Sequence, residues 1–252
     1  MQNKFTALSL GWGVQSFTLA AMAALGEIEK PDVAIHADTT HESILTYRFA
    51  ERWTGWLEER GVKVVTVMNA DNPIPYKKVV DIPAFTRRPE SDGQNRRQCT
   101  QDWKIAPMRR WLQLNRNNLP VEQWLGISTD EALRMKPSDV KYITNRWPLI
   151  EMGMSRKDCE AWLVSRGIEV PARSACTFCP YHNTAEWRRI KATPEDWQEA
   201  VSVDRAIRKA RPPYDLYVHP SRKPLEDVDL RTLEEMGQMR LWDEECAGVC
   251  GV

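Results

Sequence analysis

Short apolar runs alternate with longer amphipathic stretches over the first half of the chain. Continuous apolar runs predict buried strands over residues 4–10, 33–37, 62–67 and 121–127. Helical spacing of apolar residues predicts helices over residues 14–25, 43–60 and 103–114. Gly26 and Gly61 end the first two of these helices. Strands that alternate with helices indicate an α/β, Rossmann-like parallel sheet with crossover connections and helices on both faces.

The pattern changes after the third predicted strand. Residues 71–98 contain several prolines and a long polar run, which predicts a long loop that is functional or mobile. From Ser155 onward the apolar spacing is mostly helical, with a capping box at Ser155 and Asp158 and another helix start at Pro194. We therefore expect an α/β domain over residues 1–147 and a mainly helical, cysteine-bearing region over residues 148–252.

Charge and composition argue against two classes of partner. The 252 residues include 35 acidic and 35 basic side chains, so no global field indicates a nucleic-acid or membrane surface. No stretch approaches the roughly 20 apolar residues that a membrane span needs. We recognise no signal peptide, so we expect a cytoplasmic protein whose cysteines stay reduced.

The first predicted strand–helix junction contains a glycine turn. Gly11 and Gly13 allow the backbone to approach a phosphate, and the following helix offers free N–H groups and the positive end of its dipole. The turn is neither a Walker loop nor a dinucleotide fingerprint, and tight strand–helix packing is the alternative interpretation. Its place in the first strand–helix unit favours phosphate binding. The candidate ligands in this turn are Ser9, Gly11, Trp12, Gly13, Gln15 and Ser16.

Two further segments follow strand ends, where ligands bind in parallel sheets. Asp38 and Thr39 follow the second strand, and the carboxylate is a candidate for a ribose hydroxyl or Mg²⁺, assisted by Glu42. A helix cap is the equally supported alternative. Gly126 and Arg134 bracket a segment with paired acids after the fourth strand. That segment either closes over a nucleotide or is an exposed turn with a short helix.

Five of the six cysteines form a pattern typical of a metal or iron–sulfur site. Cys176 and Cys179 form a CxxC pair, whose spacing lets two thiolates reach one metal or cluster. Cys99 lies alone in the sequence, and Cys246 and Cys250 lie near its end. Zinc and a free redox pair are the alternative interpretations.

Cationic side chains flank Cys99, whereas Cys159 lies inside a predicted helix. Arg97 and Lys104 lie close to Cys99 in the sequence, and such charges lower the pKa of a thiol and bind phosphate or sulfate. A solvated loop edge is the alternative for the arginine. Cys159 is predicted to be a packing residue.

Together these segments resemble the phosphoadenosine phosphosulfate (PAPS) reductase family of the PP-loop, or adenine nucleotide alpha-hydrolase, superfamily. Residues 8–16 resemble its pyrophosphate-binding loop, and residues 37–39 resemble its second nucleotide motif. Residues 99–108 are similar to its cysteine–lysine–proline segment, and residues 176–179 to its CxxC. Residues 245–246 resemble the Glu-Cys-Gly tail that carries the catalytic cysteine. The resemblance covers nearly the whole chain, is greatest to an iron–sulfur subgroup frequent in phages and bacteria, and implies a HUP-type Rossmann-like fold.

The chain departs from the family pattern at three places. The usual loop reads Ser-Gly-Gly-x-Asp-Ser, and Gln15 replaces its acid, which argues against ATP cleavage. Gln98 stands where cluster-bearing reductases have a second adjacent cysteine. The tail also lacks the usual Glu-Cys-Gly continuation, so a cluster needs Cys246 or Cys250 as its fourth ligand or leaves one iron open.

The resemblance implies an enzyme with a 4Fe–4S cluster and an adenine nucleotide, either ATP or a sulfonucleotide, with Mg²⁺ as a candidate ion. The implied cluster ligands are Cys99, Cys176, Cys179 and either Cys250 or Cys246. The implied catalytic residues are Cys246, Cys250, Lys104 and Arg97. The implied partners are a sulfur donor or a thiol reductant, with a nucleic acid substrate and a homodimer as further candidates and no membrane.

Three functions are open at this point. In the favoured one, the enzyme adenylates an oxygen with ATP, and an open cluster iron or a tail persulfide delivers sulfur to a nucleotide or nucleic acid. In the second, a sulfonucleotide (PAPS or APS) reductase, Cys246 or Cys250 attacks the sulfate sulfur to give a thiosulfonate that a thiol reductant releases. The third is a non-catalytic nucleotide-binding module whose cysteines hold a structural metal.

Overall fold

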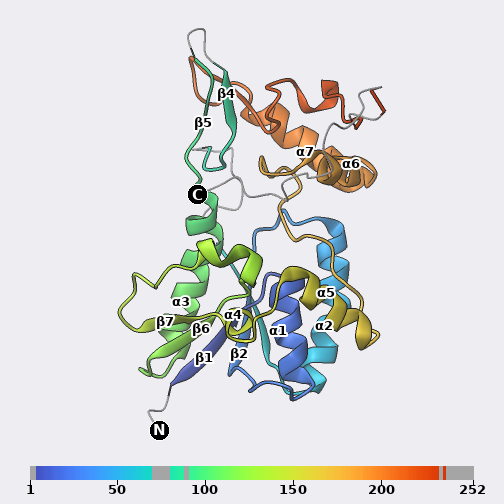
Figure 1. Ribbon diagram of the computed structural model, residues 1–252. Coiled ribbons are helices and arrows are strands. Elements are labelled where there is room, and N and C mark those ends of the chain that lie inside the picture. The colour runs from blue at the N-terminus through green and yellow to red at the C-terminus, as the bar shows by residue number, and fades with distance from the viewer. Residues whose placement is uncertain (1–3, 70–79, 88–90, 233–234, 237–252) are drawn as a thin grey trace. The chain divides into compact units, whose positions relative to one another are not determined.

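The chain folds into two units, each built from segments that are separated in the sequence. The computed structural model describes residues 4–69, 80–87, 91–232 and 235–236 (Figure 1). Unit 1 comprises Met1–Pro73 and Thr100–Ser174, and unit 2 comprises Ile74–Cys99 and Ala175–Val252. The chain therefore passes from one unit to the other after Pro73, Cys99 and Ser174.

A five-stranded parallel sheet with the strand order β3-β2-β1-β6-β7 forms the centre of unit 1 (Figure 1). Its strands are β1 (Phe5–Ser9), β2 (Val33–Asp38), β3 (Val64–Met68), β6 (Val121–Trp124) and β7 (Ile143–Arg146). From β1 the chain moves to one side for β2 and β3, and later to the other side for β6 and β7. The sheet therefore has a topological switch point between β1 and β6. The predicted Rossmann-like fold is confirmed.

Helices cover both faces of this sheet, as predicted. The helical segments of unit 1 are α1 (Val14–Ala24), α2 (Ile44–Glu59), the π-helical η1 (Thr100–Ile105), α3 (Ala106–Asn115), the 3₁₀-helical η2 (Thr129–Arg134), α4 (Pro148–Glu151) and α5 (Arg156–Ser165). Leu8 and Ala34 face the core that α1, α2, α4 and α5 complete, whereas their neighbours Ala7 and Val33 face the core of α3. Alternate strand residues thus supply two separate cores. No helix among the described residues combines the length and apolar character needed to cross a membrane.

The caps and ends of these helices follow local sequence signals. Ser43 is the N-cap of α2, and its hydroxyl accepts a hydrogen bond from the Leu45 N–H. Ser155 and Asp158 form the predicted capping box at the start of α5. Cys159 is fully buried in the first core, which confirms its predicted packing role, and burial raises the pKa of its thiol to about 11.

Two elements of unit 1 differ from the sequence prediction. The helix predicted from residue 103 is a π-helical turn up to Ile105, and α3 begins only at Ala106. Pro107 explains this start, because proline has no N–H to donate and fits only the first turn of an α-helix. Strand β7 was not predicted, because only Ile143 of its four residues is buried and no alternation is visible in its sequence.

Unit 2 contains a small antiparallel sheet beside the predicted helices. The described elements are β4 (Phe85–Arg87), β5 (Gly93–Gln94), α6 (Thr184–Lys191), α7 (Pro194–Ile207), β8 (Asp215–Tyr217) and η3 (Leu225–Asp227). Strand β4 pairs with β5 and with β8, in the order β5-β4-β8. The strands inside residues 71–98 correct the prediction of a loop there. Strands of two or three residues are too short to show a period, and β8 comes from a distant part of the sequence.

The two units differ from the boundary expected between residues 147 and 148. Leu149, Cys159 and Leu163 belong to the core around α1, so residues 148–174 lie in unit 1. Thr86 of β4 lies opposite Leu216 of β8, so residues 74–99 lie in unit 2. Burial against a sheet and strand pairing both join segments that are far apart in sequence. A division of the chain at one position therefore cannot describe these units.

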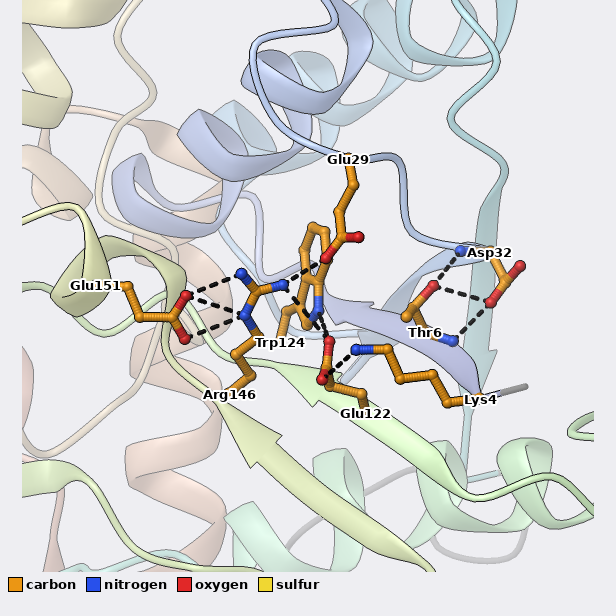
Figure 2. A network of polar contacts seen from close by, with 8 residues as sticks. All are labelled: Lys4, Thr6, Glu29, Asp32, Glu122, Trp124, Arg146 and Glu151. Carbon is orange, nitrogen blue, oxygen red and sulfur yellow. Dashed lines mark hydrogen bonds and ion pairs between the residues drawn. The ribbon is translucent and has the colours of Figure 1, made fainter. Parts of the chain in front are cut away.

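A polar network joins β6 and β7 to their flanking segments, as Figure 2 shows. The guanidinium of Arg146 binds Glu151 and Glu29 and lies 5.2 Å from the ring centroid of Trp124. The hydrogen bonds that Arg146 donates to Glu151, and then the one that it donates to Glu29, raise the pKa of Arg146. On β6, Trp124 Nε1 donates to Glu122 Oε1 at 2.9 Å, and Lys4 binds the same carboxylate. These contacts secure the β6–β7 half of the sheet.

Candidate functional site

Segments that were predicted to bind a ligand meet at the carboxyl edge of the sheet in unit 1. The turn after β1, the loop after β2 and the segment after β6 all leave the sheet at this edge. The η1 segment is attached here too, because Asn69 Nδ2, just past β3, donates to the Asp102 carbonyl oxygen at 2.9 Å. Ligands of open α/β sheets bind at this edge, at the switch point.

The glycine turn leads directly into the start of α1. Gly13 is the N-cap of α1, and in the described structure no side chain caps the helix and no acidic residue occupies its first turn. The Gly11 N–H donates to Ser16 Oγ at 3.1 Å, and Ser16 Oγ donates to the Gly13 carbonyl at 3.3 Å. The turn is thus held in shape by its own groups, and the positive end of the α1 dipole is directed toward it. Ser9 lies at the end of β1, where its hydroxyl donates to Met108 Sδ at 3.7 Å.

Trp12 lies inside this turn, but its side chain belongs to the core. Its backbone is left-handed, with φ of 56°, a conformation that costs a non-glycine residue roughly 1–2 kcal/mol. The indole is 2% exposed and packs against Phe17, His36 and Phe49. Burying about 150–250 Å² of indole contributes roughly 4–6 kcal/mol, which offsets the strain. The side chain therefore points away from the predicted nucleotide site, and only the backbone of Trp12 is available there.

Gln15 is buried, and both the nitrogen and the oxygen of its side-chain amide have hydrogen-bond partners. Its Nε2 lies 3.2 Å from Glu131 Oε2 and 3.4 Å from Ser128 Oγ, and its Oε1 accepts from Arg156 Nη1 at 3.4 Å. Arg134 binds the other oxygen of Glu131 at 2.6 Å. Gln15 thus joins α1 to η2 and α5.

Gly126 allows two backbone segments to approach closely. A Cβ atom at this position would lie 2.7 Å from Ser16 N and 2.9 Å from Ser16 Cα. The loop after β6 therefore lies directly against the first turn of α1. Close packing at this point therefore requires a residue without a side chain. The role of Gly126 in nucleotide binding stays a prediction.

Asp38 ends β2 and is tied into the loop that follows. Its Oδ1 accepts hydrogen bonds from the Thr40 N–H at 2.7 Å and from the Tyr47 hydroxyl at 2.8 Å. Burial, and then this bond to Asp38, raise the pKa of Tyr47. The N-cap of α2 is Ser43, so neither Asp38 nor Thr39 caps that helix. Oδ1 accepts both hydrogen bonds, so among the described residues Oδ2 is the oxygen of Asp38 that a ligand can use.

Glu42 is a buried carboxylate, with a side chain only 1% exposed. Its Oε1 lies 3.0 Å from Lys104 Nζ, and its Oε2 accepts from Ser174 Oγ at 3.0 Å. Lys104, predicted to be catalytic, is therefore held at the carboxyl edge and remains 39% exposed. We expected Glu42 to assist Asp38, but its two oxygens instead bind a lysine and a serine.

Several residues of this edge carry no sequence signal for the site. Ser174 is 132 positions from Glu42, and Arg156 is 141 positions from Gln15, so only tertiary contacts bring these pairs together. Tyr47 lies in the first turn of α2 and resembles any amphipathic helix residue in the sequence. A cavity of about 350 Å³ elsewhere in unit 1 is lined by Trp124, Arg146 and neighbouring residues, and it includes none of the predicted site residues.

The CxxC turn lies in unit 2, directly before α6. The Cys179 N–H donates to the Cys176 carbonyl at 3.0 Å, and the His182 N–H donates to the Cys179 carbonyl at 3.1 Å. His182 Nε2 lies 2.8 Å from the Cys176 carbonyl. Because a carbonyl only accepts, Nε2 carries the hydrogen of this bond. Both cysteines are partly exposed, and the turn is braced by a buried histidine.

Cys99 lies in the same unit, two residues after Arg97. Its N–H donates to the Asp81 carbonyl at 3.0 Å, and the Arg97 guanidinium lies 5.4 Å from the Tyr181 ring centroid. Among the residues that the structure describes, no three His, Cys, Asp or Glu side chains are grouped so that they could hold a metal ion. Cys246 and Cys250 lie outside the described residues. The described cysteines thus do not by themselves form the predicted cluster site, which stays a prediction.

Comparison with known proteins finds similarity in structure but not in sequence. No family model matches the chain, and no curated protein matches it in sequence. Among solved structures, the chain is similar to phosphoadenylyl-sulfate (PAPS) reductase from Candida auris in a phosphate complex, at 12% sequence identity and a TM-score of 0.45. The similarity covers 67% of this chain and 76% of that chain.

Proposed function

We propose that the chain is a PAPS-reductase-like, nucleotide-binding enzyme of sulfur metabolism that uses ATP to transfer sulfur to a nucleotide or nucleic acid. The observation that carries the proposal is the switch point between β1 and β6, where the glycine turn leads into an α1 N-terminus that no described side chain caps. Backbone N–H groups and the helix dipole at such a point favour a phosphate.

The residues of the carboxyl edge suit the parts of an adenine nucleotide. The N–H groups that follow Gly13 bind the phosphates, and Lys104 supplies a positive charge beside them. Asp38 Oδ2 accepts a ribose hydroxyl or binds Mg²⁺. The polar segment with Glu131 and Arg134 adjoins the phosphates through Gln15.

The reaction proceeds in two displacements. An oxygen of the acceptor attacks the α-phosphorus of ATP, and pyrophosphate leaves with the bonding electron pair. Hydrosulfide then attacks the activated carbon, and AMP leaves with the former acceptor oxygen. When a persulfide attacks instead, the product is joined to the sulfur carrier through a disulfide, and a thiol reductant attacks the carrier sulfur, forms a new disulfide with it and releases the sulfur-bearing product. Lys104 and the N–H groups after Gly13 stabilise the negative charge that develops on the phosphate oxygens. Because the described cysteines do not fit a cluster by themselves, no step is assigned to one.

A sulfonucleotide reductase is the second candidate, and the contacts of Gln15 favour it. The loop presents an amide that Ser128, Glu131 and Arg156 already engage, where the family pattern has an acid. In this reaction a tail thiolate, Cys246 or Cys250, attacks the sulfonucleotide sulfur, and the nucleotide leaves with the bridging oxygen. A thiol reductant then attacks the cysteine sulfur and releases sulfite. Such chemistry needs a phosphate site but no cleavage of ATP.

Anaerobically purified protein tests these alternatives. We expect one adenine nucleotide to bind per chain by calorimetry. AMP and pyrophosphate from ATP support sulfur transfer, whereas sulfite released from PAPS with a dithiol supports the reductase. Nucleotide binding without turnover of either would favour a non-catalytic module, and absence of binding would overturn the proposal. Iron and sulfide analysis near four of each per chain supports the cluster, and stoichiometric zinc without sulfide contradicts it.

Lys104→Met is the sharpest variant for the binding edge. We expect it to weaken ATP or PAPS binding about tenfold, which is the effect of roughly 1.4 kcal/mol. Lys209→Met is the matched control, because Lys209 forms an exposed ion pair with Asp215 in unit 2. Equal affinities of Lys104→Met and the control would remove Lys104 from the proposed site.

A further inference from the structure

Burying the carboxylate of Glu42 in unit 1 costs desolvation free energy. Its carboxylate is buried, and replacing a buried ion pair with apolar residues is often neutral or stabilising. A buried carboxylate of this kind is therefore not explained by stability alone. What it does in unit 1 is hold two groups from distant segments, Lys104 with one oxygen and Ser174 with the other.

Each partner of Glu42 has a place in the proposed site. Ser174 lies beside the glycine turn, and Lys104 is the cation of the site. A Cβ atom placed on Gly13 would lie 3.9 Å from Ser174 Cβ, so the Ser174 side chain lies beside the turn, within reach of an added methyl group. Lys104 is joined to Ser174 through the two oxygens of Glu42. One carboxylate thus connects the lysine to the turn at which the phosphate is proposed to bind.

Both partners also lie close in sequence to points where the chain passes between the two units. Lys104 follows Cys99 by five residues, and Ser174 is the last residue of unit 1, two residues before Cys176. Glu42 therefore fixes the unit 1 ends of the segments that lead to two predicted cluster ligands. The same contacts that place the cation also anchor these segments.

We propose that Glu42 is a positioning residue that fixes Lys104 and Ser174 beside the glycine turn, so that the lysine meets the phosphates of the bound nucleotide. The inference rests on the proposed nucleotide site and adds the residue that orients its cation. Glu42 itself does not touch the nucleotide, because its side chain is buried and both oxygens are occupied within the protein.

A double-mutant cycle tests this arrangement, with ATP as the probe and calorimetry as the measurement. We expect Glu42→Gln and Lys104→Met each to weaken ATP binding about tenfold, or roughly 1.4 kcal/mol. If Glu42 acts through Lys104, the double variant binds ATP about as well as Lys104→Met alone. A merely structural role for Glu42 would instead make the two losses add, to about a hundredfold.

Control variants separate positioning from folding. Glu122→Gln removes another carboxylate that binds a lysine in unit 1, Lys4, and it is expected to leave ATP affinity unchanged. Ser174→Ala removes one hydrogen bond to Glu42 and is expected to weaken ATP binding about threefold. Glu42→Asp keeps the charge with a shorter reach and is expected to retain part of the affinity, so it serves if Glu42→Gln does not fold.

The outcomes distinguish the two levels of proposal. A wild-type protein that binds neither ATP nor PAPS would overturn the proposed function, and the positioning role with it. Wild-type binding that Glu42→Gln and Glu42→Asp leave unchanged would overturn only the positioning role. Additive losses in the cycle would likewise show that Glu42 does not act through Lys104.

Discussion

His36 lies on β2, two residues before Asp38, and its ring is buried beside Trp12. Its Nδ1 lies 3.1 Å from the Leu10 carbonyl, and the ring centroids of His36 and Trp12 are 6.3 Å apart. Burial is the largest effect on its pKa and lowers it below the ordinary 6.5. The bond to Leu10 and the nearby Glu42 and Asp38 carboxylates oppose that shift, and Lys104 adds to it. The folded protein therefore favours the neutral ring.

This lowered pKa predicts a loss of stability in mild acid. Above the ordinary pKa of 6.5 the ring is neutral in both states, and it contributes no pH dependence. As the pH falls through that value, the unfolded chain takes up the proton first, so the free energy of unfolding decreases. We expect His36→Gln to lose less stability than the wild type between pH 7.5 and 5.5, measured by urea unfolding. Burial lowers the pKa of His219 too, so part of the slope remains; identical slopes in both proteins would contradict the prediction.

At the scale of elements, the site depends on how closely the start of α1 approaches the loop after β6. The approach is made by backbone atoms, because a Cβ on Gly126 would meet the nitrogen and Cα of Ser16. Backbone in a helix cannot move aside as a flexible side chain can. The glycine therefore sets the distance between two elements, and with it the shape of the switch point.

Gly126→Ala is expected to destabilise the protein by about 1–3 kcal/mol, the usual cost of overpacking. The variant should also weaken nucleotide binding, since the first turn of α1 must shift. Gly55→Ala is the matched control, because it lies inside α2 with no atom within 4 Å of the added Cβ. It is expected to stabilise by up to about 1 kcal/mol through helix propensity. Urea unfolding compares the two, and a Gly126→Ala protein as stable as the wild type would disprove the close contact.

At the scale of the whole molecule, each unit has its own internal supports. In unit 2 the buried Asp204 of α7 accepts hydrogen bonds from the backbone N–H groups of Val218 and Leu225, both at 3.0 Å, and pairs with Arg208. One carboxylate thus joins α7 to the segments around β8 and η3. Equivalent supports in unit 1 are the Arg146 network and the two cores that flank the sheet.

Asp204→Asn should therefore loosen unit 2 selectively. The amide nitrogen cannot accept the Leu225 N–H, and Arg208 loses its partner, which costs about 3–5 kcal/mol for a buried pair. Hydrogen exchange is expected to accelerate at Val218 and Leu225 while protection in β1, β2 and β6 is unchanged. Asp215→Asn, which removes an exposed pair with Lys209, should cost about 0–1 kcal/mol. Equal loss of protection in both units would show that they unfold together.

The spacing of apolar residues along the sequence was enough to predict the helices and strands in which that spacing is regular. The apolar runs of β1, β2 and β3 and the spacing in α1 and α2 are visible over five or more residues, so these elements were predicted with small errors at their ends. The capping box at Ser155 is likewise a local signal, and the structure has it. Strands β4, β5, β7 and β8 have two to four residues, and their stability comes from partners that the sequence does not place beside them.

The candidate site shows the same division. The sequence by itself determined the alternation of strands and helices, and therefore a glycine turn, an aspartate and a polar segment at strand ends that a parallel sheet brings to one edge. Only the tertiary structure decided that Trp12 turns into the core, that Gln15 is engaged by η2 and α5, and that Glu42 holds Lys104 and Ser174. The physical reason is range: periodicity and turn chemistry act between near neighbours, whereas burial and ion pairing act between groups that only the folded chain brings together.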